Sequence, residues 1–274
     1  MVTVTSTSIN NLSTNISYVS AEEAHSLMQT AFERLMMLIE SLEPEDWNKP
    51  TACTEWNVHD MVAHQAGGYA SGTGYGEMLR QYTSIPKPGQ LPEDAINALQ
   101  VSERKGKTSN ELIAELKSVG PVAMQKWAYQ FRLVKPIGMP HPVGGWISLR
   151  HLMWIIHSRD TWMHRLDICR ATGRSFEQTP EHDGRIAALV MRDVGKALSK
   201  KLGGRAISFE LSGVAGGGWK FGTGEPAATV KMDVLEFNIF ASGRASFEQS
   251  RALMTITGDA EFVEELLRGL IVLY

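Results

Sequence analysis

The chain has 274 residues, and its 27 Lys and Arg against 30 Asp and Glu give a formal net charge of −3 at pH 7. This near balance offers no electrostatic basis for binding nucleic acid or an anionic membrane. With 43% hydrophobic and 21% charged residues, the composition is that of a globular protein and excludes a disordered chain.

Residues 1–19 form a lead rich in Ser, Thr and Asn that lacks the apolar stretch of a secretory signal, and we expect it to be flexible. Ser20 then precedes apolar residues at three- and four-residue steps, which predicts a helix over 20–42. The same period predicts further helices that begin near Thr54 (with 67–76 either its continuation or a loop) and that span 109–131, 148–172 and 180–202. Prolines and glycines predict a loop around 86–92 and a long connection over 134–145.

The pattern changes after Gly204, where short alternating segments replace the helical period. Strands are expected at 206–211, 219–221, 227–232 and 254–257, and helices at 233–242 and 259–273. We therefore expect a helical domain over 20–203 and a small α+β domain over 204–274.

Two helical pairs of a carboxylate and a histidine are candidates for metal binding. Asp160 and His164 stand four residues apart, as do Asp60 and His64, so each pair lies on one helix face. Apolar residues flank both pairs, and His157 shares the stripe of Asp160. Buried polar groups need partners, which a metal or neighbouring carboxylates can supply, so ion pairs, helix caps and satisfied core histidines remain alternatives.

The two cysteines, Cys53 and Cys169, are too few for a disulfide framework, although they could form one bridge, and this low number favours a reducing, cytoplasmic location. Either thiol is also a candidate nucleophile. No run of 18 apolar residues predicts a transmembrane helix.

Two segments make the sequence resemble a known family. The first holds Trp47, the turn Pro50-Thr51-Ala52-Cys53-Thr54-Glu55-Trp56 and a helix that reaches Ala63-His64, and the second runs from Asp160 through His164-Arg165 to Asp167 and Gly173. Together they resemble the mycothiol-dependent maleylpyruvate isomerase-like proteins, which belong to the DinB-like metalloenzymes. The resemblance implies a DinB-like four-helix bundle, followed by a small α/β domain similar to sterol-carrier proteins.

The resemblance also implies the site. It places a divalent metal, of which zinc is the expected one, on His64, Asp160 and His164, with Asp160 standing where the isomerases usually carry Glu. Asp60 then loses its claim as a ligand, and Asp167 becomes a candidate support for the site. An arginine of the second domain holds the substrate in the isomerases, and Arg244 is preferred for this role over Arg251, with a surface arginine that caps a helix end as the alternative.

The implied activity is thiol chemistry on a metal, in which a low-molecular-weight thiol (mycothiol or an analogue) adds to an activated alkene such as maleylpyruvate. Either cis–trans isomerisation or thiol transfer follows. The alternatives are a metal-dependent hydrolase on the same bundle and a non-catalytic protein that binds a small ligand. The expected partners are a small-molecule substrate and the thiol, with no nucleic acid and no membrane, for a monomer or homodimer.

Overall fold

The structure is a computed structural model that describes residues 16–88, 90–131, 135–141, 143 and 145–274. The chain divides into a helical unit, formed by Val19–Met139 and Trp146–Phe176, and an α+β unit, formed by Met1–Tyr18, Pro140–Gly145 and Glu177–Tyr274. Most of the expected lead, up to position 15, lies outside the described residues.

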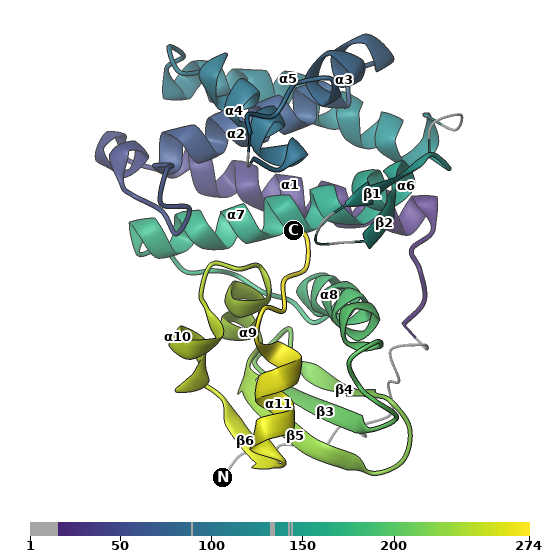
Figure 1. Cartoon of the computed structure of the whole chain (residues 1–274). Coiled ribbons are helices and arrows are strands. Elements are labelled where there is room, and N and C mark those ends of the chain that lie inside the picture. The colour runs from purple at the N-terminus through teal and green to yellow at the C-terminus, as the bar shows by residue number, and fades with distance from the viewer. Residues whose placement is uncertain (1–15, 89, 132–134, 142, 144) are drawn as a thin grey trace. The chain divides into compact units, whose positions relative to one another are not determined.

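Four long helices build the helical unit (Figure 1). They are α1 (Ala21–Glu40), α2 (Val58–Ser71), α5 (Ser109–Tyr129) and α7 (His157–Thr172). Both α1 and α2 pack against α5 and α7, so the apolar stripes of the four helices meet in one core. Fully buried members of this core include Leu35, Met61, Leu112, Trp127 and Trp162.

The helix ends agree with the expected capping residues. The Ser20 side chain accepts a hydrogen bond from the backbone N–H of Glu23, as expected for the start of α1. Gly173 ends α7 with φ 73°, a left-handed conformation that costs glycine little.

Shorter elements occupy the segments between the long helices. They are η2 (Pro44–Asn48), α3 (Tyr75–Tyr82), α4 (Pro92–Ser102), the paired strands β1 (Gly138–His141) and β2 (Gly145–Ser148), α6 (Leu149–His151) and the π-helical turn η3 (Leu152–Ile156). The sequence did not predict α4, which starts at Pro92 because the fixed φ of proline suits a first helical turn. The expected helix over 148–172 is confirmed as a continuous helical run, in which η3 is a π-helical turn between α6 and α7.

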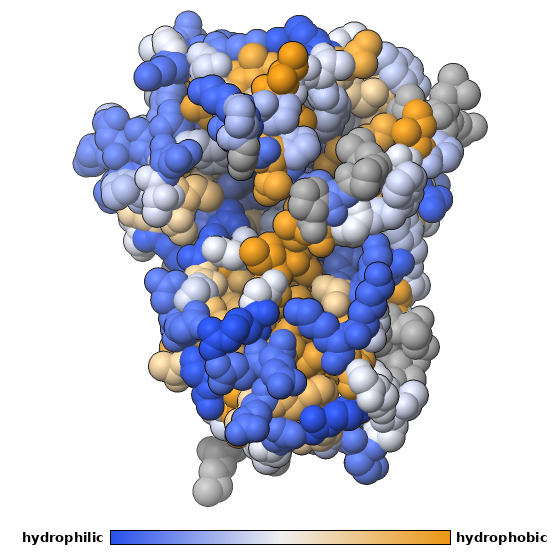
Figure 2. All heavy atoms as spheres, in the orientation of Figure 1, coloured by the Kyte–Doolittle hydropathy of each residue, from blue (hydrophilic) through white to orange (hydrophobic). Residues whose placement is uncertain are grey.

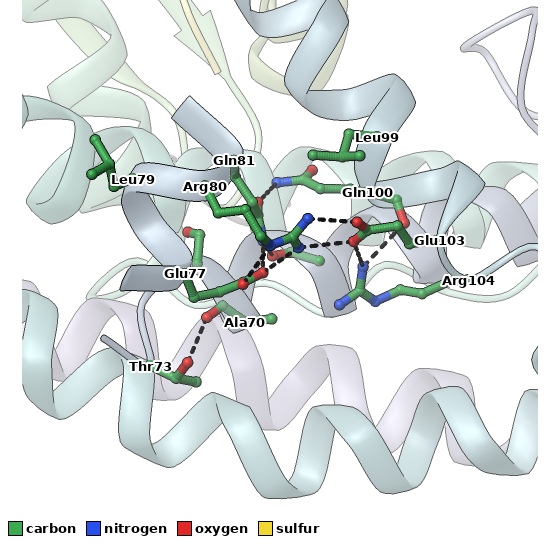
Figure 3. A network of polar contacts seen from close by, with 12 residues as sticks. Ala70, Thr73, Glu77, Leu79, Arg80, Gln81, Leu99, Gln100, Glu103 and Arg104 are labelled. Atoms are coloured by element: carbon green, nitrogen blue, oxygen red, sulfur yellow. Dashed lines mark hydrogen bonds and ion pairs between the residues drawn. The ribbon is translucent and has the colours of Figure 1, made fainter. Parts of the chain in front are cut away.

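A polar network joins α3 to α4 (Figure 3). The Arg80 guanidinium donates to both Glu77 and Glu103, and the buried Gln81 amide accepts from Gln100. The Gln81 amide also donates to the carbonyl of Gly67 in α2, over 3.1 Å. These bonds tie the two shorter helices to α2. On the face shown in Figure 2, hydrophilic residues surround the exposed hydrophobic ones.

The α+β unit contains a four-stranded sheet in the order β4-β3-β5-β6 (Figure 1). Its elements are α8 (Asp183–Leu198), β3 (Ala206–Ser212), β4 (Gly217–Phe221), β5 (Pro226–Asp233), α9 (Val234–Ala241), α10 (Phe247–Arg251), β6 (Thr255–Gly258) and α11 (Ala260–Leu267). The central strand β3 pairs antiparallel with β4 and parallel with β5. Phe209 stands opposite both Trp219 and Val230, and all three side chains are buried in the core.

The helix α8 belongs to the α+β unit, whereas the sequence analysis had placed it in the helical domain. Its apolar face, with Val190, Val194 and Leu198, joins the core that contains Phe209. The boundary therefore falls at 176/177 and not at 203/204. An amphipathic period shows that a helix has an apolar face, but it does not identify the surface that this face covers.

Candidate metal centre

The structure brings His64 of α2 together with Asp160 and His164 of α7. The Nε2 atom of His164 lies 3.2 Å from Asp160 Oδ1, and the Nε2 atom of His64 lies 3.4 Å from Asp160 Oδ2. One ligating atom from each of the three residues lies within 4.8 Å of the other two. Both histidine side chains are buried, at 7% and 6% exposure, while the Asp160 side chain is 24% exposed and forms the accessible side of the group.

Local helix geometry explains why these side chains meet. Asp160 and His164 are one turn apart on α7, as the four-residue spacing predicts. His64 lies in the middle of α2, which packs against α7. The ring of Trp56, which precedes α2, is 4.9 Å from the His64 ring centroid and 6.0 Å from that of His164. The tryptophan therefore covers both histidine rings.

Asp60, the other carboxylate at a four-residue spacing, serves as a helix cap. Asn57 caps α2 by accepting from the Asp60 backbone N–H, and the Asp60 carboxylate accepts from the Asn57 N–H in return. Such a reciprocal pair satisfies two N–H groups at a helix start. Asp60 therefore caps the start of α2, and it is not one of the three residues that meet around Asp160.

Two further side chains support the group. Asp167 Oδ2 is 3.2 Å from the Nδ1 atom of His164. The Gln65 amide donates to Asp160 Oδ2 over 2.5 Å. Asp167 was expected from the sequence, but Gln65 was not, because nothing near residue 65 indicates a partner in α7.

The electrostatics of the group favour a charged carboxylate. Burial alone would raise the pKa of Asp160, but the imidazoles of His164 and His64 outweigh it and hold that pKa well below the usual range. Two imidazoles around an ionised carboxylate form a donor set that zinc binds in proteins, with three protein ligands and room for a further one. The Nδ1 atom of His64 is buried without a hydrogen-bond partner among the described residues. The donor set and its close spacing fit a divalent ion.

Comparison with known proteins gives the family. A family model described as the mycothiol maleylpyruvate isomerase N-terminal domain matches residues 28–169, which is more than half of the chain. The chain belongs to this family.

Two crystal structures are similar in fold to this family member. They are those of the mycothiol-dependent maleylpyruvate isomerase, at 13% identity, and of a histidine-to-alanine mutant of it, at 12%. Each alignment has a TM-score of 0.58 and covers 92% of this chain and 98% of the other. No curated protein matches the chain. Among the described helices, none combines the length and apolar character needed to cross a bilayer.

The cysteines of this family member differ in their surroundings. The Sγ atom of Cys53 approaches His164 and Asp167, and these three residues form a second group whose ligating atoms lie within 4.8 Å. Because the His164 Nδ1 atom already faces Asp167, this group is a less suitable cation site than the one around Asp160. Cys169 is buried, and its Sγ contacts the Ser175 carbonyl at 3.5 Å, which is typical of a structural thiol.

The two candidate arginines lie in the α+β unit. Arg244 is half-buried in the turn after α9, and its backbone N–H donates to the Ile239 carbonyl. Arg251 ends α10, and its guanidinium donates to the Met254 carbonyl over 3.2 Å. Arg244 lies in the α+β unit and the metal centre in the helical unit, and the role of Arg244 toward that centre stays a prediction.

His157 lies one turn before Asp160 on α7 and stacks on Trp127 with ring centroids 3.9 Å apart. Its Nε2 atom is buried and has no hydrogen-bond partner among the described residues. Burial lowers the pKa of His157 to about 4, against an opposing effect of Asp160. The imidazole is therefore neutral at pH 7.

Proposed function

We propose that this chain is a metal-dependent enzyme that uses a low-molecular-weight thiol, mycothiol or an analogue, to isomerise an activated cis-alkene such as maleylpyruvate. The observation that carries the proposal is the cluster of His64, Asp160 and His164. The match to the mycothiol maleylpyruvate isomerase family also supports it. We further propose that the helical unit is a DinB-like four-helix bundle and that the α+β unit is similar to sterol-carrier proteins.

In this proposal His64, Asp160 and His164 hold a divalent ion, with zinc as the expected one. The ion would supply Lewis acidity, which favours the thiolate form of a bound thiol over the neutral thiol. Asp167 would hold the Nδ1 proton of His164, which would leave the Nε2 atom beside Asp160 free to ligate the ion. Trp56 covers the histidine rings and limits the access of water from its side.

The reaction balances without a further reactant. The thiolate forms a C–S bond to one alkene carbon, and the π electron pair moves onto the conjugated carbonyl oxygen to give an enolate. The former double bond is then a single bond, and rotation about it gives the trans arrangement. Loss of the same thiolate then restores the double bond in the trans form. Arg244 is proposed to bind a carboxylate of the substrate, since an arginine matches that group in geometry and charge.

Metal content measured by elemental mass spectrometry tests the first half of this proposal. We expect about one zinc per chain in the wild type and its loss in His164→Ala. His59→Ala is the matched control, because His59 also lies on α2 but its Nε2 contacts the Lys107 carbonyl instead of the cluster. A wild-type protein that stays free of metal after reloading would contradict the proposal.

Turnover of maleylpyruvate with and without mycothiol tests the second half. Isomerisation that requires the thiol and is lost in His164→Ala supports the proposal. Thiol-independent hydrolysis of a test ester by the zinc-loaded protein would favour the hydrolase, and ligand binding without turnover would favour the binding protein.

A further inference from the structure

The carboxylate of Asp160 is held by a side chain outside the proposed ligand set. Asp160 Oδ2 accepts a hydrogen bond of 2.5 Å from the Gln65 amide. Gln65 follows His64 directly on α2 and is only 2% exposed, so its amide cannot turn to bulk water instead. A buried amide with this partner restricts rotation of the carboxylate about its last torsion.

A second hydrogen bond determines which way the Gln65 amide faces. Its Oε1 atom accepts from the Thr161 hydroxyl over 2.9 Å, and the same Thr161 oxygen lies 3.0 Å from the Tyr69 hydroxyl. Since a hydroxyl has one proton to donate, Thr161 gives its proton to Gln65 and accepts the proton of Tyr69. The amide nitrogen must then face Asp160.

Tyr69, at the far end of this series of hydrogen bonds, keeps its proton and remains a donor. Tyr69 is 3% exposed, and its burial raises the pKa of the phenol well above its usual value. Each hydrogen bond in this series is therefore donated in the same direction, from Tyr69 through Thr161 and Gln65 to Asp160. Connected hydrogen bonds in a buried setting strengthen one another, and a fully satisfied network favours a single arrangement.

We propose that Gln65 is a positioning residue, supported by Thr161 and Tyr69, that fixes the orientation of the Asp160 carboxylate for metal binding. This inference rests on the proposed function. The Asp160 side chain is 24% exposed, so its carboxylate could turn toward solvent unless neighbouring groups hold it. Gln65 holds the carboxylate from α2, while Thr161 ties the amide back to α7.

The experiment compares zinc affinity, measured by competition with a chromogenic chelator, between the wild type and Gln65→Met. Methionine keeps a similar size and flexibility but removes the donor and the acceptor. Loss of a partner that orients a metal ligand typically costs 10–100-fold in metal affinity, so we expect a rise in Kd of about that size. Gln81→Met is the matched control, because Gln81 is equally buried but contacts Gly67 and Gln100 instead of Asp160.

Thr161→Val provides a second variant in case Gln65→Met does not fold. It replaces a hydroxyl by a methyl group and frees the Gln65 amide to turn, so we expect a smaller rise in Kd than for Gln65→Met. Wild-type zinc affinity in the folded variants would overturn the inference, whatever happens to their thermal stability.

A metal-free crystal structure of each variant separates this inference from the proposed function. If the wild type binds no zinc, the proposed function fails, and the orientation of Asp160 decides the inference. A rotated or multiply placed carboxylate in Gln65→Met supports it. An Asp160 carboxylate that keeps its wild-type orientation and contacts to His64 and His164 overturns it.

Discussion

The Oδ2 atom of Asp167 lies 3.2 Å from Nδ1 of His164, the ring nitrogen that does not contact Asp160. Asp167 is buried at 1% exposure, so its charge is poorly solvated and the imidazole N–H is a favourable partner. With an ion bound beside Asp160, this contact would favour the tautomer whose proton lies on Nδ1 of His164. That tautomer is the one able to ligate an ion from the Asp160 side.

Replacing Asp167 by asparagine tests this relationship. The amide oxygen can still accept from Nδ1, but it lacks the charge that strengthens the bond and raises the basicity of the ring. We expect Asp167→Asn to bind zinc about tenfold more weakly in chelator competition. Asp60→Asn is the control, because Asp60 only caps α2, and its zinc affinity should match the wild type. Equal affinities for wild type and Asp167→Asn would contradict the role of Asp167.

The buried His157 predicts a dependence of stability on pH. Burial lowers its pKa from the usual 6.5 to about 4 in the folded protein, so the unfolded chain binds the extra proton between these pH values. Stability therefore falls as the pH drops from 6.5 to 4, by about 3 kcal/mol for this group, and the loss is complete below pH 4. Urea unfolding with a chelator present, at pH values from 4 to 7, should show a smaller pH dependence for His157→Gln. Parallel profiles for the two proteins would rule out this origin.

The close approach of α1 and α5 depends on Gly120. A Cβ atom at this position would lie 2.4 Å from the ring of Phe32, which is buried in the helical unit. The clash should outweigh the gain in helix propensity, so we expect Gly120→Ala to lower the free energy of unfolding by about 1–3 kcal/mol. Gly76→Ala, in α3 with open space around it, should leave stability unchanged or raise it. Denaturant unfolding of both variants measures the difference.

The candidate centre was predictable where it depends on spacing within one helix. The four-residue spacing of Asp160 and His164 places both side chains on one face of α7, and the family resemblance joined His64 to this pair. Gln65 was not predictable, because its partner Asp160 is 95 positions away and no local pattern joins them. The sequence indicates that a polar group needs a partner, but only tertiary packing identifies it.

Fold prediction failed at short helices and at a long-range choice. Pro86, Pro88 and Pro92 indicated a loop, although proline is also common in a first helical turn, where α4 begins. The apolar face of α8 was correctly inferred, but it could have packed against the core of either unit. In the structure it belongs to the core that contains Phe209, in the α+β unit.

Two arginines near α4 allow the stability contribution of a buried ion pair to be compared with that of an exposed one. The Arg104 side chain is 7% exposed and lies 2.7 Å from Glu115. The Arg80 side chain is 46% exposed and lies 2.6 Å from Glu103 (Figure 3). Removing Arg104 leaves the mostly buried Glu115 carboxylate with Lys107 alone, so we expect Arg104→Met to cost about 3 kcal/mol of stability. Arg80→Met should have a much smaller effect, because water and salt already screen the pair. The free energy of unfolding is measured for both variants at low salt and at 1 M salt. The loss of stability caused by Arg80→Met should decrease at 1 M salt by a larger fraction than the loss caused by Arg104→Met. A larger loss of stability for Arg80→Met would contradict burial as the deciding factor.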